Sequence, residues 1–117
     1  MSGRLMTEYG EVIIDNEVIA RIAGLSAVEC YGVVGMASIN VTDGLVQLLL
    51  GESLTKGIKV NLEDNKVTLD LHIIVEYGTK ISAIADNLIS TVKYRVEDMI
   101  GIDVEKVNIF VEGVRVD

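Results

Sequence analysis

The 117-residue chain contains no proline, a single cysteine and only five aromatic residues, which are four tyrosines and one phenylalanine. A single cysteine excludes a small scaffold held together by disulfides and is typical of proteins from a reducing compartment. No cationic residue adjoins Cys30, so we expect a buried, inert thiol. Half of the residues are hydrophobic, and 42 are Val, Ile or Leu, which excludes a disordered chain.

Basic residues are also scarce, with ten Lys and Arg against eighteen Asp and Glu, which gives a net charge of −8. They form no basic block, and this disfavours direct binding to nucleic acid or to anionic lipid headgroups. The longest stretch without charge spans residues 30–42 and includes Gly, Ser, Asn and Thr, whereas a membrane-spanning helix needs about 20 apolar residues. We therefore expect no direct membrane insertion and a cytoplasmic location.

No proline-rich, serine-rich or highly charged segment divides the sequence. We expect one domain over residues 9–117, preceded by a flexible leader over residues 1–8. Residues 9–15 alternate as in a short strand, and Asp15 or Asn16 can cap the helix that follows.

That helix is expected to end near Glu29. The β-branched pair between Gly32 and Gly35 then predicts a short strand. Residues 43–54 predict a brief apolar turn or helix that ends by Gly51.

The clearest element of the sequence is a β-hairpin. Apolar and polar residues alternate over 58–63 and again over 66–73, and the Asp-Asn pair between them tolerates positive φ. A two-residue turn places Glu63 opposite Lys66 and brings the apolar residues together on one face. The expected apolar pairs are Leu62 with Val67, Val60 with Leu69 and Ile58 with Leu71.

A second helix is predicted from a cap at Thr79 or Ser82 to Gly101, because apolar residues recur there every three or four positions. A last strand is predicted over residues 106–112. Two amphipathic helices and four or five strands with one apolar face each predict an α+β fold. We expect a two-layer sandwich in which both helices cover one face of a mixed or mostly antiparallel sheet.

Three large apolar residues fall out of phase with the alternation that builds the core, and we expect them to point to the second face of the sheet. Such a patch favours contact with another protein. Burial beneath the segment over residues 37–56 would explain it equally well without a partner. A triplet of leucines in that segment fits either explanation, since three successive residues cannot all face inward. The candidate interface consists of Ile13, Ile74, Phe110, Leu48, Leu49 and Leu50.

The sequence shows no motif for catalysis, cofactor binding or metal binding. His72, the only histidine, is expected on the polar face of the hairpin, where Asp70 and Glu76 would make a weak cation site at most. The segment from Gly32 to Gly35 is similar to the GxxG loop of RNA-binding KH domains, but no basic residue flanks it. We therefore expect no catalytic residue, no cofactor, no metal ligand and no nucleic-acid partner.

Taken as a whole, the chain resembles the alkaline shock protein family, the envelope stress response proteins of Gram-positive bacteria. The resemblance runs from about Glu8 to Val116 and depends on the order and spacing of several segments. These segments are Ile22-Ala23-Gly24, Gly32-Val33-Val34-Gly35-Met36, Val75-Glu76-Tyr77-Gly78 and Val107-Asn108-Ile109-Phe110-Val111-Glu112-Gly113-Val114.

The resemblance implies a small α+β domain with no known catalytic residues and a role in cell-envelope homeostasis. Some family members assemble with themselves and are held at the inner face of the membrane by a separate anchor protein. We therefore expect a non-enzymatic interaction or scaffold protein that forms homo-oligomers and docks onto a membrane-anchored protein partner. Two alternatives are a regulatory accessory subunit of a fatty-acid or dihydroxyacetone-type kinase system, since members are often encoded beside one, and a KH-like RNA-binding module.

Overall fold

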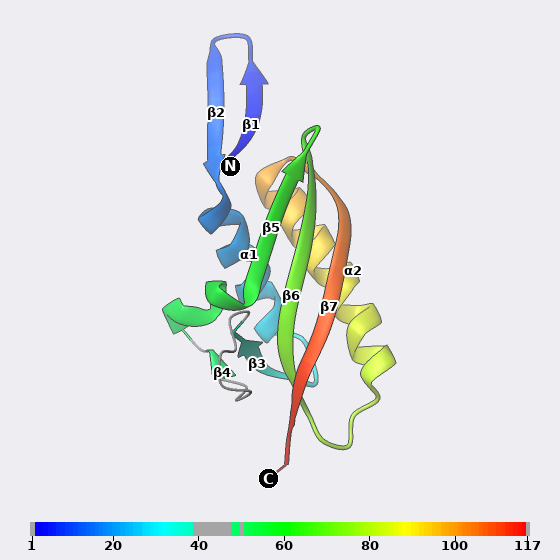
Figure 1. Cartoon of the computed structure of the whole chain (residues 1–117). Helices are drawn as coiled ribbons and strands as arrows, with labels where there is room; N and C mark the ends of the chain where they lie inside the picture. The colour runs from blue at the N-terminus through cyan, green and yellow to red at the C-terminus, as the bar shows by residue number, and fades with distance from the viewer. Residues whose placement is uncertain (1, 39–47, 50, 117) are drawn as a thin grey trace.

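The computed structural model describes residues 2–38, 48–49 and 51–116. Within these residues, two α-helices and one 3₁₀ helix are connected to a main sheet and a separate hairpin (Figure 1). The elements are β1 (Ser2–Thr7), β2 (Gly10–Asp15), α1 (Asn16–Val28), β3 (Val33–Ala37), β4 (Leu48–Leu49), η1 (Gly51–Gly57), β5 (Ile58–Glu63), β6 (Lys66–Glu76), α2 (Ile81–Ile100) and β7 (Asp103–Arg115).

The central strand of the main sheet is β6. Along one side it pairs in parallel with β7 over residues 66–76. Along the other side it pairs antiparallel with β5 beside residues 66–71 and with β3 beside residues 73–75. The short β4 extends the sheet beyond β3. The expected mixed, mostly antiparallel sheet is therefore confirmed.

The hairpin of β5 and β6 has the register that its alternating sequence predicts. Glu63 lies opposite Lys66, and the three apolar pairs form as expected, from Leu62 with Val67 to Ile58 with Leu71. Asp64 and Asn65 adopt φ angles of 52° and 61°, the left-handed conformation that a tight hairpin turn requires.

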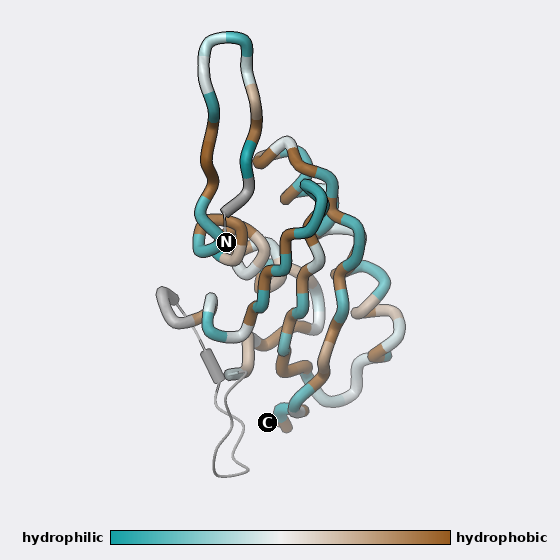
Figure 2. The backbone as a smooth tube through the Cα atoms, turned by 45° about the horizontal axis from the view of Figure 1, so that its top comes forward, coloured by the Kyte–Doolittle hydropathy of each residue, from teal (hydrophilic) through white to brown (hydrophobic). Residues whose placement is uncertain are grey.

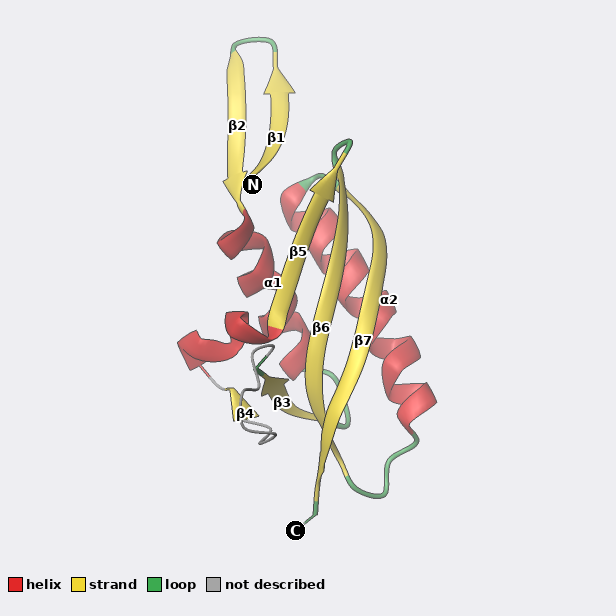
Figure 3. Cartoon of the chain, in the orientation of Figure 1, coloured by secondary structure: helices red, strands yellow, loops and turns green. Residues whose placement is uncertain are grey.

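The core lies between the main sheet and the two helices, which cover the same face of that sheet (Figure 3). Successive side chains of a strand point to opposite faces, and hydrophobic and hydrophilic positions alternate along β5, β6 and β7 (Figure 2). The two-layer α+β arrangement is as predicted. Buried core residues include Val67, Leu69, Leu71, Ile73 and Val75 of β6, Ile19 and Ala23 of α1, and Ile84, Leu88, Val92 and Val96 of α2.

The ends of the helices agree with the sequence prediction at three of four points. Asp15 caps α1 by accepting a hydrogen bond from the backbone N–H of Glu17 at 2.8 Å. The helix ends at Val28, and Gly101 ends α2 with a left-handed φ of 81°. The predicted cap of α2 is wrong: Lys80 occupies that position, and its ammonium group cannot accept a hydrogen bond from the first N–H groups of the helix. The Thr79 hydroxyl lies one residue earlier and donates to the carbonyl of Glu76.

The structure also places an additional strand ahead of the predicted first one. In the region expected to be a flexible leader, β1 pairs antiparallel with β2 from Ser2 opposite Asp15 to Thr7 opposite Gly10. The resulting two-stranded hairpin extends from the body of the molecule beyond the start of α1 (Figure 1). The radius of gyration of 14.6 Å accordingly exceeds the value of about 13.4 Å expected for a compact chain of this length.

The segment before β5 differs from its prediction. Residues 43–47 and Leu50 lie outside the described residues. The described part contains the short strand β4 and then η1, which begins at Gly51 where the predicted turn or helix was to end. The last strand, β7, is longer than the predicted range of 106–112 because both of its ends continue to pair with β6.

A hydrogen-bonded cluster joins the end of α2 to the start of β7. Glu97 Oε2 accepts from the backbone N–H of Val104 at 3.0 Å and from Lys93 Nζ at 2.9 Å, while Lys93 Nζ also donates to the Val104 carbonyl at 2.8 Å. The hydrogen bond from the Val104 N–H, followed by the Lys93 ammonium, lowers the pKa of Glu97 below its ordinary value.

We expect Glu97→Gln to lower the free energy of unfolding by about 1 kcal/mol at pH 7, a figure reduced for the partial exposure of the carboxylate. The folded chain holds the pKa of Glu97 below its unfolded value of about 4.3, so the ionised carboxylate stabilises the fold above that pH. This contribution disappears as the pH falls through the folded-state pKa. Urea titrations at several pH values test this expectation.

A matched control is Asp98→Asn, which removes an exposed acid from the same helix and is expected to change the free energy by less than about 0.5 kcal/mol. If the difference between wild type and Glu97→Gln stayed constant from pH 7 to pH 3, the stabilising role of the ionised carboxylate would be refuted.

Candidate functional site: the open face of the main sheet

The main sheet has one face covered by helices and an opposite face, which we call the open face. Since the odd-numbered residues of β6 lie in the core, its even-numbered residues belong to the open face. Residues paired directly on neighbouring strands share a face, which adds residues of β7 to this surface. The open-face residues of these two strands include Thr68, Asp70, His72 and Ile74 of β6 and Lys106, Asn108 and Phe110 of β7.

An aromatic stack occupies the middle of the open face. The rings of His72 and Phe110, which are directly paired across β6 and β7, lie 4.7 Å apart between centroids and only 10° from parallel. His72 Nδ1 lies 3.2 Å from Glu112 Oε1, a hydrogen bond that becomes an ion pair when the imidazole is protonated. Phe110 stays 42% exposed. The stack therefore presents an apolar ring in a fixed orientation to whatever meets this face.

Polar pairs surround the stack. Asn108 Nδ2 donates to Asp70 Oδ1 at 2.9 Å, one step along the strands from His72 and Phe110. On the other side of Asp70 lies Lys59 of β5, which completes a row of polar residues across three strands. The prediction that His72 sits on a polar strand face is confirmed, although its aromatic neighbour was not foreseen.

The predicted interface residues do not all come together. Ile74 is on the same face as Phe110 but is buried, with 8% exposure, outside the core cluster. Ile13 is elsewhere: the prediction that it shares the second face is wrong, because β2 pairs with β1 and not with the main sheet. It is 61% exposed on the N-terminal hairpin.

The leucine triplet is only partly described. Leu48 and Leu49 form β4, whose backbone pairs with β3 opposite Ala37 and Met36. Leu50 lies outside the described residues. Coverage of the open face around Ile74 by this segment and coverage by another chain therefore both stay predictions.

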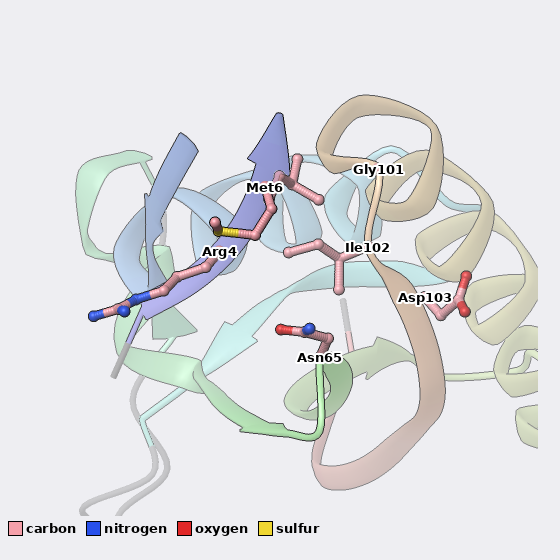
Figure 4. A pocket seen from close by; sticks show the side chains of 7 residues that line it. Arg4, Met6, Asn65, Gly101, Ile102 and Asp103 are labelled. Atoms are coloured by element: carbon pink, nitrogen blue, oxygen red, sulfur yellow. The ribbon is translucent and has the colours of Figure 1, made fainter. Parts of the chain in front are cut away.

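A cavity of about 320 Å³ lies between the N-terminal hairpin and the end of the main sheet (Figure 4). It is lined by parts of β1, the turn between β5 and β6, and the connection from α2 to β7. The side chains of Met6 and Ile102 lie toward its middle, whereas the charged ends of Arg4 and Asp103 point away from one another (Figure 4). Arg4 pairs instead with Glu11, at 3.4 Å. The cavity thus lacks converging charged groups, and the sequence could not indicate it because β1 was not expected.

Chemically reactive groups are sparse in the described residues. No group of three or more His, Cys, Asp or Glu side chains within them is arranged to hold a metal ion. Cys30 is buried, as expected, and its thiol donates to the carbonyl of Ser26 at 3.5 Å. The segment from Gly32 to Gly35 forms the start of β3, after α1, and is not a loop between two helices as in a KH domain. None of the helices described is both long and apolar enough to span a membrane.

Comparison with solved structures identifies the class of fold. The structure of the copper form of the MamM CTD aligns with a TM-score of 0.52, at 14% identity over 86% of this chain and 87% of that one. A variant of the same domain aligns at 15% identity and the same TM-score, over 85% of this chain and 98% of that one. At this identity the likeness shows a shared α+β fold only.

Sequence comparison goes further. Residues 4–116 match the alkaline shock protein 23 family, described by a cell envelope-related function, and the chain belongs to this family. The uncharacterized protein YloU of Bacillus subtilis is 51% identical over 99% of this chain and 98% of its own length. A stress response regulator gls24 homolog of Streptococcus pyogenes is 31% identical over 91% of this chain but 59% of its own length. The resemblance to the alkaline shock proteins is thereby confirmed.

Proposed function

We propose that this domain is a non-enzymatic interaction module of cell-envelope homeostasis that associates with copies of itself and docks onto a membrane-anchored protein. The single observation that carries the proposal is the exposed Phe110 ring held against His72 on the open face. The envelope-related description of the family supports the setting. The net charge of −8 favours contact with a protein at the membrane over contact with anionic lipid itself.

The proposed arrangement places the chain in the cytoplasm and brings it to the inner membrane face through its partner. A fixed aromatic ring loses little conformational freedom on binding, which is why such residues serve well as anchors of protein interfaces. The polar pairs around the ring, such as Asn108 with Asp70, then form the hydrated rim of the contact.

Replacing Phe110 by Asp is expected to reduce self-association and recruitment to membranes. The substitution puts a carboxylate in place of the exposed apolar ring, and desolvating that charge on binding is costly. We expect at least about a tenfold rise in the dissociation constant of self-association, from light scattering over a concentration series. Membrane fractionation of cells that express each tagged variant tests recruitment.

Tyr94→Asp provides a matched control, since Tyr94 is 70% exposed on α2, away from the open face. A wild-type chain that stays monomeric at about millimolar concentration and is absent from the membrane fraction would contradict the proposal. Equal effects of Phe110→Asp and Tyr94→Asp would show that the open face is not the contact surface.

A further inference from the structure

The outer edge of β7 is a long strand edge. Among the described residues, β7 pairs with β6 alone, so one side of a 13-residue strand has no neighbouring strand. Unpaired strand edges expose backbone N–H and C=O groups that readily accept another strand. Apolar side chains flank this edge and stay exposed: 42% for Phe110, 37% for Val111 and 49% for Val114.

The charges of β7 complement those of an antiparallel copy of the same strand. The strand carries acidic residues at positions 103, 105 and 112 and basic residues at 106 and 115, so each end holds both signs. Two antiparallel copies can therefore set acidic residues of one strand against basic residues of the other, which offsets the repulsion between two chains of net charge −8. The occupant that this edge fits best is a second copy of the chain.

From these features we infer that β7 pairs antiparallel with β7 of a second copy, with Ile109 opposite Ile109 across a two-fold axis. This inference rests on the self-association proposed above and names the surface that would produce it. In this register, residues that lie equally far before and after Ile109 face each other. The pairs are Asp103 with Arg115, Val104 with Val114, Glu105 with Gly113, Lys106 with Glu112, Val107 with Val111, and Asn108 with Phe110.

The register matches the two faces of the sheet wherever both members of a facing pair are themselves paired with β6. Four valines of β7 pair with core residues of β6 and therefore share the core face: Val104, Val107, Val111 and Val114. In the proposed register each of these valines faces another of the four. Asn108 and Phe110 share the open face and meet one another. The pairing thus extends both faces of the main sheet from one copy into the other.

The two irregular positions of β7 also agree with this two-fold arrangement. The register of β7 against β6 shifts at Glu105 and again at Glu112. Under the proposed symmetry Glu112 falls opposite Lys106, the residue next to Glu105, so each irregular region faces the other. Both charged pairs of the edge, Asp103 with Arg115 and Lys106 with Glu112, then join opposite charges, and each occurs twice.

Other registers lose this agreement. A shift of one residue places Ile109, on the core side, opposite Phe110, on the open side. A shift that centres the axis on Phe110 sets Lys106 against Val114, and one centred on Asn108 sets Val104 against Glu112. Each pairs a core-face residue with an open-face one, and none keeps Lys106 opposite Glu112.

The test reverses one charge of the pair and then restores the attraction. Lys106→Glu places two acids opposite each other twice per dimer, so we expect the dissociation constant from sedimentation equilibrium to rise about tenfold or more. The swap Lys106→Glu with Glu112→Lys should bring it back to within about threefold of wild type. Lys56→Glu, at an exposed position of η1, is the charge-matched control and should change nothing.

The outcomes separate this inference from the proposed function. A monomeric wild type overturns both. An associating wild type that Lys106→Glu does not weaken, or a swap that does not restore association, overturns the β7 register while self-association stands. Thermal melts followed by circular dichroism verify that each variant folds. Should the swap not fold, Asp103→Arg with Arg115→Asp examines the second charge pair in the same way, and a failure to restore association there is equally decisive.

Discussion

Replacing Leu69 by alanine is expected to lower the free energy of unfolding by about 3–4 kcal/mol, a large share of the stability of a domain this size. Leu69 lies at the centre of β6, between Val60 of β5 and Val107 of β7, and is fully buried beneath the helices. Its removal leaves a cavity in the core with paired strands on either side, so the surroundings can collapse only in part. Urea denaturation followed by circular dichroism measures the loss.

Leu25→Ala is the matched control, because it makes the same chemical change at a leucine that is 51% exposed on α1. We expect a change of less than about 0.5 kcal/mol there, since alanine also favours the helix. Similar losses for Leu25→Ala and Leu69→Ala would mean that the packing between sheet and helices is not the main source of stability.

The hairpin of β5 and β6 could be derived to the residue pair because all of its determinants are local. Alternation assigns each side chain to a face, and a two-residue turn then leaves a single register. The end of α2 at Gly101 followed from local chemistry in the same way, since glycine readily adopts the left-handed conformation. Local determinants thus placed the central part of the sheet and one helix end.

The N-terminal hairpin was missed because its first strand lacks a comparable signal. Its sequence, Ser-Gly-Arg-Leu-Met-Thr, alternates poorly and becomes a strand only through pairing with β2. With β1 unrecognised, Ile13 had no strand to pair with other than those of the main sheet, and it was assigned to the wrong surface. A tertiary context that the residues themselves do not signal decided this element.

The open face was predicted in part. The alternation of β6 and the final strand correctly put Ile74 and Phe110 opposite the core. The stack of His72 on Phe110 could not be foreseen, since it depends on the parallel register of two strands separated by α2. Such a register is set by the packing of the crossover helix and not by a turn. The role of these residues as an interface stays a prediction.

The replacement of Gly57 by alanine is the second change for which we expect a large effect, a loss of about 2–3 kcal/mol. Gly57 is buried where β5 and β3 meet beside β6. A Cβ atom there would lie 2.5 Å from the carbonyl oxygen of Ala37 and 3.3 Å from that of His72. Because both are backbone atoms of neighbouring strands, no side-chain rotation relieves the clash, and β3 must move away from β5.

The same substitution at Gly10 isolates this steric effect. A Cβ atom at Gly10 meets no atom within 4 Å, so Gly10→Ala is expected to leave the free energy of unfolding within about 0.5 kcal/mol of wild type. Hydrogen exchange gives the second measurement: Gly57→Ala should accelerate exchange of the β3 amides paired with β6 more than that of the β5 amides. Uniform acceleration throughout the main sheet would instead assign the loss to global unfolding and contradict a displacement confined to β3.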